Sequence, residues 1–252
     1  MTYVGAMRAA LADVGDPALR SARAAQQQAY MKSALPYVGL SAPELKALLK
    51  PLLAEHRFID RAQWEDAVVE LWDDVTHREE WYAAIALLRH RSYRDWLDPD
   101  LLPLLEHLVR TGAWWDVVDE IASHLVGQVL LDHRAVVTPV MDAWSLDGDS
   151  MWVRRAAMLA QLRHAEETDT DLLERVLVAN LDDTAYGKEF FVRKALGWAL
   201  RQHARTDPAW VLTFVRTHAD RLSGLSRREA LKHLGRDVAE DQTGTSSTAP
   251  TA

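Results

Sequence analysis

The stretch Gly112-Ala-Trp-Trp-Asp-Val-Val-Asp-Glu-Ile121 holds two tryptophans and three acidic residues. On a helical wheel that advances about 100° per residue, its apolar side chains gather on one side, as in an amphipathic helix. This stripe consists of Trp114, Val117, Val118, Ile121 and Leu125. The spacing therefore predicts a helix over residues 113–127 with Trp114 in the core.

Trp115 and Asp119 lie outside this stripe, about 100° and 140° away from Trp114. They are i, i+4 neighbours, so their side chains meet on a second face of the same helix. One interpretation is that Trp115 packs on a neighbouring repeat while Asp119 caps a helix or forms a salt bridge. The other is that both side chains face a substrate. This helix alone leaves both interpretations open.

The same helical period of apolar residues runs along nearly the whole chain, and no stretch alternates as a half-buried strand does. The sequence therefore predicts an all-α protein, with short breaks such as Asp98-Pro99 between the helices. The predicted helices cover residues 3–14, 18–34, 42–55, 62–75, 78–90, 99–111, 113–127, 134–145, 150–163, 169–180, 186–205, 208–221 and 226–235.

Pairs of these helices recur roughly every 35 to 40 residues, which is the period of HEAT-like repeats. We therefore expect an α-solenoid of HEAT-like helical repeats over residues 1–236, with a concave face that offers a long binding surface. Residues 237–252 are polar and small, and we expect a disordered tail there.

The composition excludes several kinds of site. The 252-residue chain has no cysteine, so disulfides and thiolate zinc sites are excluded, and its ten histidines form no HxxxH or HExxH pair. We expect no metal and no cofactor. The net charge of -8 disfavours unspecific attraction to nucleic acid, although one basic surface can coexist with acidic outer faces. Without a membrane-spanning run or a signal pattern, we expect a cytoplasmic protein.

A second predicted helix repeats the two-faced pattern in Lys188-Glu-Phe-Phe-Val-Arg-Lys-Ala-Leu-Gly-Trp-Ala-Leu-Arg201. Phe191 and Trp198 lie together roughly 100 to 120° away from its buried stripe, with Lys194 and Arg201 beside them. Gly197 costs this helix about 1 kcal/mol relative to alanine. Either another helix or the backbone of a ligand approaches closely at that position.

Three further motifs carry cations. In "MWVRRAAM" (151–158), Arg154 and Arg155 lie near a helix N-terminus, where the helix dipole disfavours positive charge. The arginines are either solvated or paired with Asp147 or Asp149, or they hold a phosphate together with the N-terminal amides of the helix. In "YMKSALPYVG" (30–39), Tyr30 and Lys32 precede a turn and either contact a nucleic acid or belong to an ordinary surface.

The third motif is "LSRREALKHL" (225–234), in which Ser226 and Glu229 fit a helix-capping box. Its positive residues are Arg227, Arg228 and Lys232, followed by His233. They form either a solvated helix face or a phosphate clamp.

Taken together, "YMKSALPYVG", "GAWWDVVD", "MWVRRAAM", "KEFFVRKALGWALR" and "LSRREALKHL" resemble the motifs of DNA alkylation repair enzymes of the AlkD-like family. Their order and spacing match from about residue 5 to 236. The resemblance implies a HEAT-like-repeat DNA glycosylase that excises positively charged alkylated bases, such as 3-methyladenine and 7-methylguanine, from duplex DNA in base excision repair.

The resemblance also implies roles for single residues. It assigns Trp115, Asp119 and Trp198 to the catalytic cleft and Arg155 to phosphate binding. It places further residues near the DNA: Tyr30, Phe190, Phe191 and Arg201. Ser41 stands where the family can have a longer polar side chain.

The chemistry of such a reaction follows from the charge of the lesion. A cationic alkylpurine leaves as a neutral base, so no general acid is needed, and Asp119 would stabilise the sugar as it becomes an oxocarbenium ion. Trp115 and Trp198 would each add about 0.5 to 2 kcal/mol of cation–π attraction. No lysine lies in this group, so we expect hydrolysis without lyase activity. The family is thought to need no pocket for a flipped base.

The cations predicted to line the concave DNA-binding face are Arg155, Lys194, Arg201, Arg227, Arg228 and Lys232, with Lys32 near Tyr30. We expect a monomer that binds double-stranded DNA containing alkylated purines. The alternative is a noncatalytic HEAT-like scaffold that binds DNA or protein.

Overall fold

The computed structural model describes residues 1–15 and 17–234. The regular secondary-structure elements formed by these residues are all helices. The chain divides into two compact units, Met1–Leu97 and Asp98–Ala252. The all-α prediction is confirmed, and the succession of short packed helices is consistent with an α-solenoid of repeats. The concave face stays a prediction, as does the disordered tail, because residues 237–252 lie outside the described residues.

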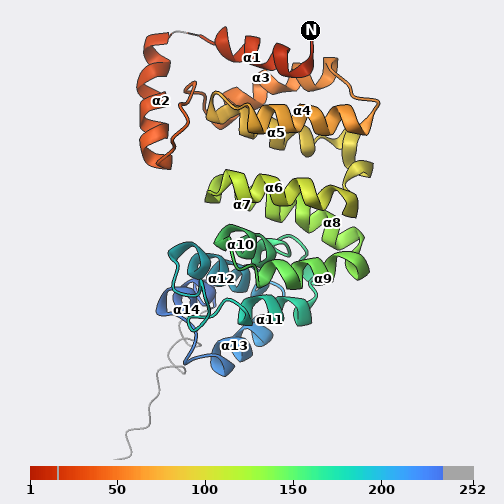
Figure 1. Cartoon of the computed structure of the whole chain (residues 1–252). Helices are drawn as coiled ribbons and strands as arrows, with labels where there is room; N and C mark the ends of the chain where they lie inside the picture. Colours follow the sequence, from red (N-terminus) through yellow and green to blue (C-terminus); the bar gives the residue numbers. More distant parts are fainter. Residues whose placement is uncertain (16, 235–252) are drawn as a thin grey trace, which may run out of the picture. The chain divides into compact units, whose positions relative to one another are not determined.

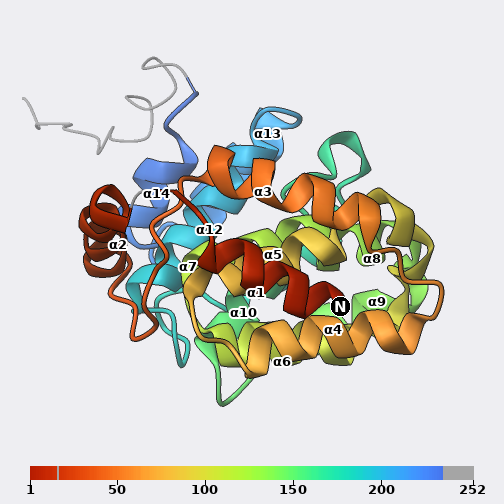
Figure 2. The same ribbon diagram turned by 90° about the horizontal axis from the view of Figure 1, so that it is seen from above.

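Within residues 1–15 and 17–97, the first unit contains five α-helices and one 3-10 helix. They are α1 (Tyr3–Ala12), α2 (Pro17–Met31), α3 (Ala42–Glu55), α4 (Arg61–Asp73), α5 (Arg78–Leu88) and the 3-10 helix η1 (Arg91–Trp96). Figure 2 shows α1 between α3 and α4, and α4 packs along α5. The buried Trp64 contacts the rings of Tyr93 and Trp96, so η1, which the sequence did not predict, closes this core.

The helix α2 stands beside the other helices of this unit in Figure 1. It contacts the segment 36–40 at Gly39 and Leu40. Gly39 has φ +94°, and a Cβ there would lie 2.5 Å from the carbonyl oxygen of Arg20, so this close approach requires glycine. Gln27 of α2 donates from Nε2 to the carbonyl oxygen of Leu40 at 2.7 Å. The segment 36–40 therefore packs directly against α2, the helix that ends just before Lys32.

The buried carboxylate of Glu79 on α5 holds the same segment from the other side. The backbone N–H groups of Val38 and Gly39 donate to Glu79 at 3.0 Å, and that of Leu40 donates at 3.3 Å. Because backbone donors without a partner are costly when buried, this one side chain decides whether the segment 38–40 packs.

The second unit is built around one buried helix, α10. Its elements are the 3-10 helix η2 (Pro99–Leu101), α6 (Leu102–Gly112), α7 (Trp115–Glu120), the π-helix η3 (Ile121–Val126), α8 (Gly127–Asp132), α9 (Arg134–Ser145), α10 (Met151–Leu159), the 3-10 helix η4 (Ala165–Glu167), α11 (Thr170–Val178), α12 (Phe190–His203), α13 (Pro208–Thr217) and α14 (Gly224–Ala230). Every residue of α10 from Trp152 to Leu159 is buried, and α10 packs against α6, α7, η3, α9, α11 and α12.

The helix predicted over 113–127 begins two residues later, at Trp115, and continues through the π-helix η3 into α8, which ends at Asp132. Val117, Val118, Ile121 and Leu125 are fully buried as predicted. Trp114, however, is wrong as a core residue of that helix: Ala113 ends α6 in the left-handed region with φ 36°, and Trp114 is the extended, half-buried N-cap of α7. The wheel assumed one continuous helix, whereas the chain turns just before Trp115.

We predict that Glu79→Ala lowers the free energy of unfolding by on the order of 3 kcal/mol, because three backbone donors lose their acceptor. Chemical denaturation measures the change. Glu55→Ala, at an exposed carboxylate near the end of α3, is the matched control and should change stability by less than about 0.5 kcal/mol. Equal effects of the two substitutions would contradict the role given to Glu79.

Candidate functional site

A charged pair between Asp119 of α7 and Arg155 of α10 forms the centre of the candidate site. Nε of Arg155 donates to Oδ1 of Asp119 at 2.7 Å, and a terminal guanidinium nitrogen donates to Oδ2 at 2.8 Å. The side chain of Asp119 is 14% exposed and that of Arg155 is 5% exposed. This fork geometry fixes the direction of the carboxylate as well as its distance.

Arg155 also links the pair to a third helix, because its other terminal nitrogen donates to the carbonyl oxygen of Phe191 in α12. One guanidinium therefore joins α7, α10 and α12. Asp119 is therefore the acidic residue that compensates the charge of Arg155 near the start of α10. Asp147, one of the predicted partners, pairs with Arg110 instead. A direct phosphate contact by Arg155 stays a prediction.

The neighbouring Arg154 is used differently. Its guanidinium donates to the carbonyl oxygens of Asp147 at 2.6 Å and Leu146 at 3.1 Å, and lies 5.1 Å from the ring centre of Tyr186. Carbonyl groups that end one helix are thus satisfied by the start of the next. Arg154 therefore holds the loop before α10 in place.

Burial raises the pKa of the Asp119 carboxyl above its ordinary value, and the charges of Asp116 and Glu120 act in the same direction. The hydrogen bonds and positive charge of Arg155 oppose that rise. The raised pKa means that enclosure outweighs the attraction to Arg155. Asp119 is thus a poorly hydrated carboxylate, which interacts more strongly with a cation than a solvated one does.

Aromatic rings surround the start of α10 and α12. Trp114 lies 5.9 Å from Trp152 and 5.3 Å from Phe191, and Trp152 lies 5.0 Å from Phe191 between ring centres. Phe190 is 58% exposed and touches Phe191 edge-on. Trp114 and Trp152 therefore pack around Phe191, whose carbonyl oxygen accepts from Arg155, and the sequence did not predict this contact between the three rings. For Trp114 the helical spacing had indicated only burial in the core.

The two tryptophans predicted to be catalytic are half-buried. Trp115 lies one turn before Asp119 on α7, so the two share a side of that helix. Trp198 lies seven residues after Phe191 on α12, about two turns along the same side. The sequence thus correctly kept both rings out of the buried stripes, and their catalytic role stays a prediction.

A family model for DNA alkylation repair enzymes matches residues 7–234 of the chain. The chain belongs to the family of DNA alkylation repair enzymes. The solved structure of a predicted DNA alkylation repair enzyme from Enterococcus faecalis is similar to it, with 31% sequence identity and a TM-score of 0.75 over 85% of this chain and 96% of the other. A search of curated proteins found no match.

Two of the cations predicted to bind DNA are already paired in this DNA alkylation repair family member. Lys194 donates to Glu229 at 3.0 Å, and Arg201 pairs with the same carboxylate. A Cβ on Gly197 would lie 2.6 Å from Cβ of Glu229 and 2.9 Å from the carbonyl oxygen of Ser226. Of the two explanations left open for Gly197, close packing of another helix is therefore confirmed.

The capping box predicted at Ser226 and Glu229 is wrong. The N-cap of α14 is Ser223, whose hydroxyl accepts from the N–H of Ser226 at 2.9 Å. Ser226 lies inside the helix and donates to the carbonyl oxygen of Arg193 at 2.9 Å. A local motif was overruled because both side chains have partners on α12.

The remaining predicted DNA contacts differ in exposure. Arg228 and Lys232 are exposed, whereas Arg227 is half-buried. Tyr30 is 74% exposed and Lys32 follows it with φ 50° at the end of α2, in the first unit. Contact of these residues with DNA stays a prediction.

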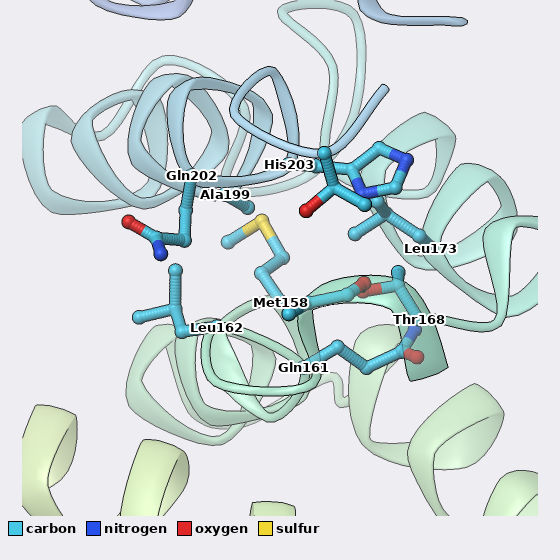
Figure 3. A pocket seen from close by; sticks show the side chains of 10 residues that line it. Met158, Gln161, Leu162, Thr168, Leu173, Ala199, Gln202 and His203 are labelled. Carbon is cyan, nitrogen blue, oxygen red and sulfur yellow. The ribbon is translucent and has the colours of Figure 1, made fainter. Parts of the chain in front are cut away.

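Away from the Asp119–Arg155 pair, the second unit contains a small cavity of about 20 Å³. Figure 3 shows Met158 between Gln202 and His203 in this cavity. Burial lowers the pKa of His203, which favours the neutral ring. The cavity is lined mainly by apolar and amide side chains, so it offers no charge for chemistry.

Within the described part of the chain, no group of three or more His, Asp or Glu residues is placed to hold a metal ion. None of the described helices combines the length and apolar character that a membrane crossing needs. That the repair reaction needs neither metal nor cofactor stays a prediction.

We predict that Arg155→Gln destabilises this repair protein by on the order of 3 kcal/mol near neutral pH, since it leaves an enclosed carboxylate without its cation. The deficit should shrink towards about pH 4, because loss of Arg155 raises the pKa of the buried Asp119 further in the variant than in the wild type. A protonated carboxyl needs no cation, so the folded variant is favoured at low pH, and that contribution is lost as the pH rises. Chemical denaturation of both proteins as a function of pH measures this difference.

Arg175→Gln is the matched control, since Arg175 forms a two-pronged pair with Asp142 at 2.9 and 3.1 Å on a largely exposed surface. It should cost less than about 1 kcal/mol at either pH. If Arg155→Gln behaved like this control, the Asp119–Arg155 pair would not be enclosed in solution.

Proposed function

We propose that this protein is a monofunctional DNA glycosylase that hydrolyses the N-glycosidic bond of positively charged alkylpurines, such as 3-methyladenine and 7-methylguanine, in duplex DNA. The reaction would begin base excision repair. Its main support is the enclosed carboxylate of Asp119, oriented by two hydrogen bonds from Arg155. Membership of the DNA alkylation repair family supports DNA as the substrate.

The chemistry needs a negative charge rather than an acid. Alkylation at N3 or N7 makes the purine cationic, so the base takes the electrons of the glycosidic bond and leaves neutral. C1′ of the sugar becomes positive, and the ionised Asp119 would stabilise that charge and position the water that attacks C1′. The water adds its oxygen to C1′ and releases a proton, which leaves an abasic site.

Arg155 is better suited to position Asp119 than to hold a phosphate alone. Its side chain is 5% exposed, and three of its nitrogens donate to Asp119 and Phe191. A carboxylate whose direction is set before substrate arrives loses little entropy in the transition state. We therefore assign Arg155 the role of a positioning residue.

The half-buried indoles of Trp115 and Trp198 would present aromatic faces to the cationic base and sugar. Such contacts strengthen when water is excluded, which the rings themselves would achieve. The backbone of the lesion would be held without a pocket for the flipped base. Hydrolysis alone is expected, because the amino group of Lys194, the lysine on α12, donates a hydrogen bond to Glu229.

We predict that Asp119→Asn slows release of 7-methylguanine from methylated duplex by on the order of 100- to 1,000-fold, because the amide cannot neutralise the sugar cation. Single-turnover release of the free base measures it. Asp142→Asn, at the exposed pair with Arg175, is the matched control and should retain full activity.

Equal release by wild type and Asp119→Asn would show that Asp119 does not stabilise the sugar. Absence of release from both, with duplex binding retained, would favour the noncatalytic HEAT-like scaffold. Activity that disappears on chelation would indicate a metal-dependent hydrolase.

We also predict that Trp115→Leu and Trp198→Leu each slow base release by about 2- to 30-fold, which corresponds to one lost cation–π contact of about 0.5 to 2 kcal/mol. Trp210→Leu on α13 is the control, since this half-buried indole contacts His203 and Phe214 instead. Rates are compared at temperatures where thermal unfolding shows all variants folded. Equal losses in all three variants would contradict a specific role for Trp115 and Trp198.

A further inference from the structure

Glu229 of α14 binds two cations of α12 at once. Its side chain is 13% exposed, and it accepts from Lys194 at 3.0 Å while pairing with Arg201. The side chain of Lys194 is still 39% exposed to solvent despite this pairing. One carboxylate thus halves the positive charge that this part of α12 presents.

The position of Glu229 is set by packing rather than by charge alone. Gly197 lies between Lys194 and Arg201 in sequence, and a Cβ there would meet Cβ of Glu229 at 2.6 Å. Ser226, one turn earlier on α14, donates to the carbonyl oxygen of Arg193. The carboxylate is therefore held over α12 before any ligand arrives, and little entropy opposes its pairing with the two cations.

A DNA phosphate is the kind of anion that would compete with this carboxylate. Lys194 and Arg201 lie on α12, as Trp198 does. The proposed function requires α12 to approach the DNA backbone near the lesion. A phosphate can bind either cation only if Glu229 gives up that contact. Each such exchange reduces the net gain of binding, because one ion pair is broken for every ion pair that forms.

We propose that Glu229 is a specificity-determining residue that weakens binding to undamaged DNA by occupying Lys194 and Arg201. The inference rests on the proposed function, since it takes α12 to face DNA. Undamaged duplex vastly outnumbers lesions, so binding that depends only on phosphate charge delays the search. Glu229 lowers this lesion-independent attraction and leaves the contacts made at the lesion to decide binding.

The test is binding to an undamaged, fluorescently labelled duplex across a range of salt concentrations, followed by anisotropy. Glu229→Gln keeps the size of the side chain against Gly197 but removes its charge. It should bind more tightly than wild type, with the slope of log affinity against log salt steeper by about 0.9 for each released cation. Between about 50 and 200 mM salt, each released cation adds a three- to fourfold loss of affinity.

Adding Lys194→Gln should then remove most of that gain, whereas Lys194→Gln alone should change wild-type binding little. Unchanged affinity and slope for Glu229→Gln would overturn the proposal, as would an equal effect of Lys194→Gln in both backgrounds. Thermal unfolding of each variant shows that it is folded at the temperature of the assay.

A second comparison leaves Glu229 intact. Lys194→Gln is set against Arg228→Gln, an exposed cation of α14 for which the described residues contain no carboxylate partner. Lys194→Gln should reduce the salt slope less than Arg228→Gln, and an equal or larger reduction would overturn the proposal. Because the duplex carries no lesion, these measurements do not depend on base release, so the proposed glycosylase activity and this inference can fail separately.

Discussion

The pair between Asp119 and Arg155 is the contact on which the second unit depends. Helix α10 is buried along almost its whole length, so a guanidinium on it is tolerable only with a counterion and with its remaining donors satisfied. Asp119 supplies the charge and the backbone of Phe191 accepts from the remaining terminal nitrogen. The carboxylate proposed to meet the sugar cation is therefore also the group that allows α10 to pack against α7 and α12.

This double role explains the electrostatic state of Asp119. A carboxylate fully exposed to water would be easy to ionise but weak in its attraction to a sugar cation, whereas an enclosed one without a partner would be protonated. Arg155 opposes the rise in the Asp119 pKa that burial causes, and it leaves the carboxylate poorly hydrated. The adjacent Arg154 shows that charge alone does not define the site, since its donors serve backbone carbonyls.

Much of the fold followed from local sequence. The helical period placed Val117, Val118, Ile121 and Leu125 in the core, and it kept Trp115 and Trp198 out of it. Trp114 was misjudged because a wheel assumes an unbroken helix, and a single left-handed residue, Ala113, invalidates that assumption. The Ser226–Glu229 capping box failed for a different reason: a capping motif describes only local partners, and the partners of Glu229 lie on another helix.

By itself the sequence determined the helical class, the buried stripes and the motifs that identify the repair family, because each depends on spacing within one helix or on residue order. Only the tertiary structure decided which opposite charges meet. Arg155 pairs with Asp119, whereas Asp147 pairs with Arg110. Glu229 pairs with Lys194 and Arg201 of α12 and does not cap its own helix. Such pairing depends on which charged side-chain atoms come within about 3 Å of each other once the helices pack, and hydrophobic burial along the chain determines how the helices pack.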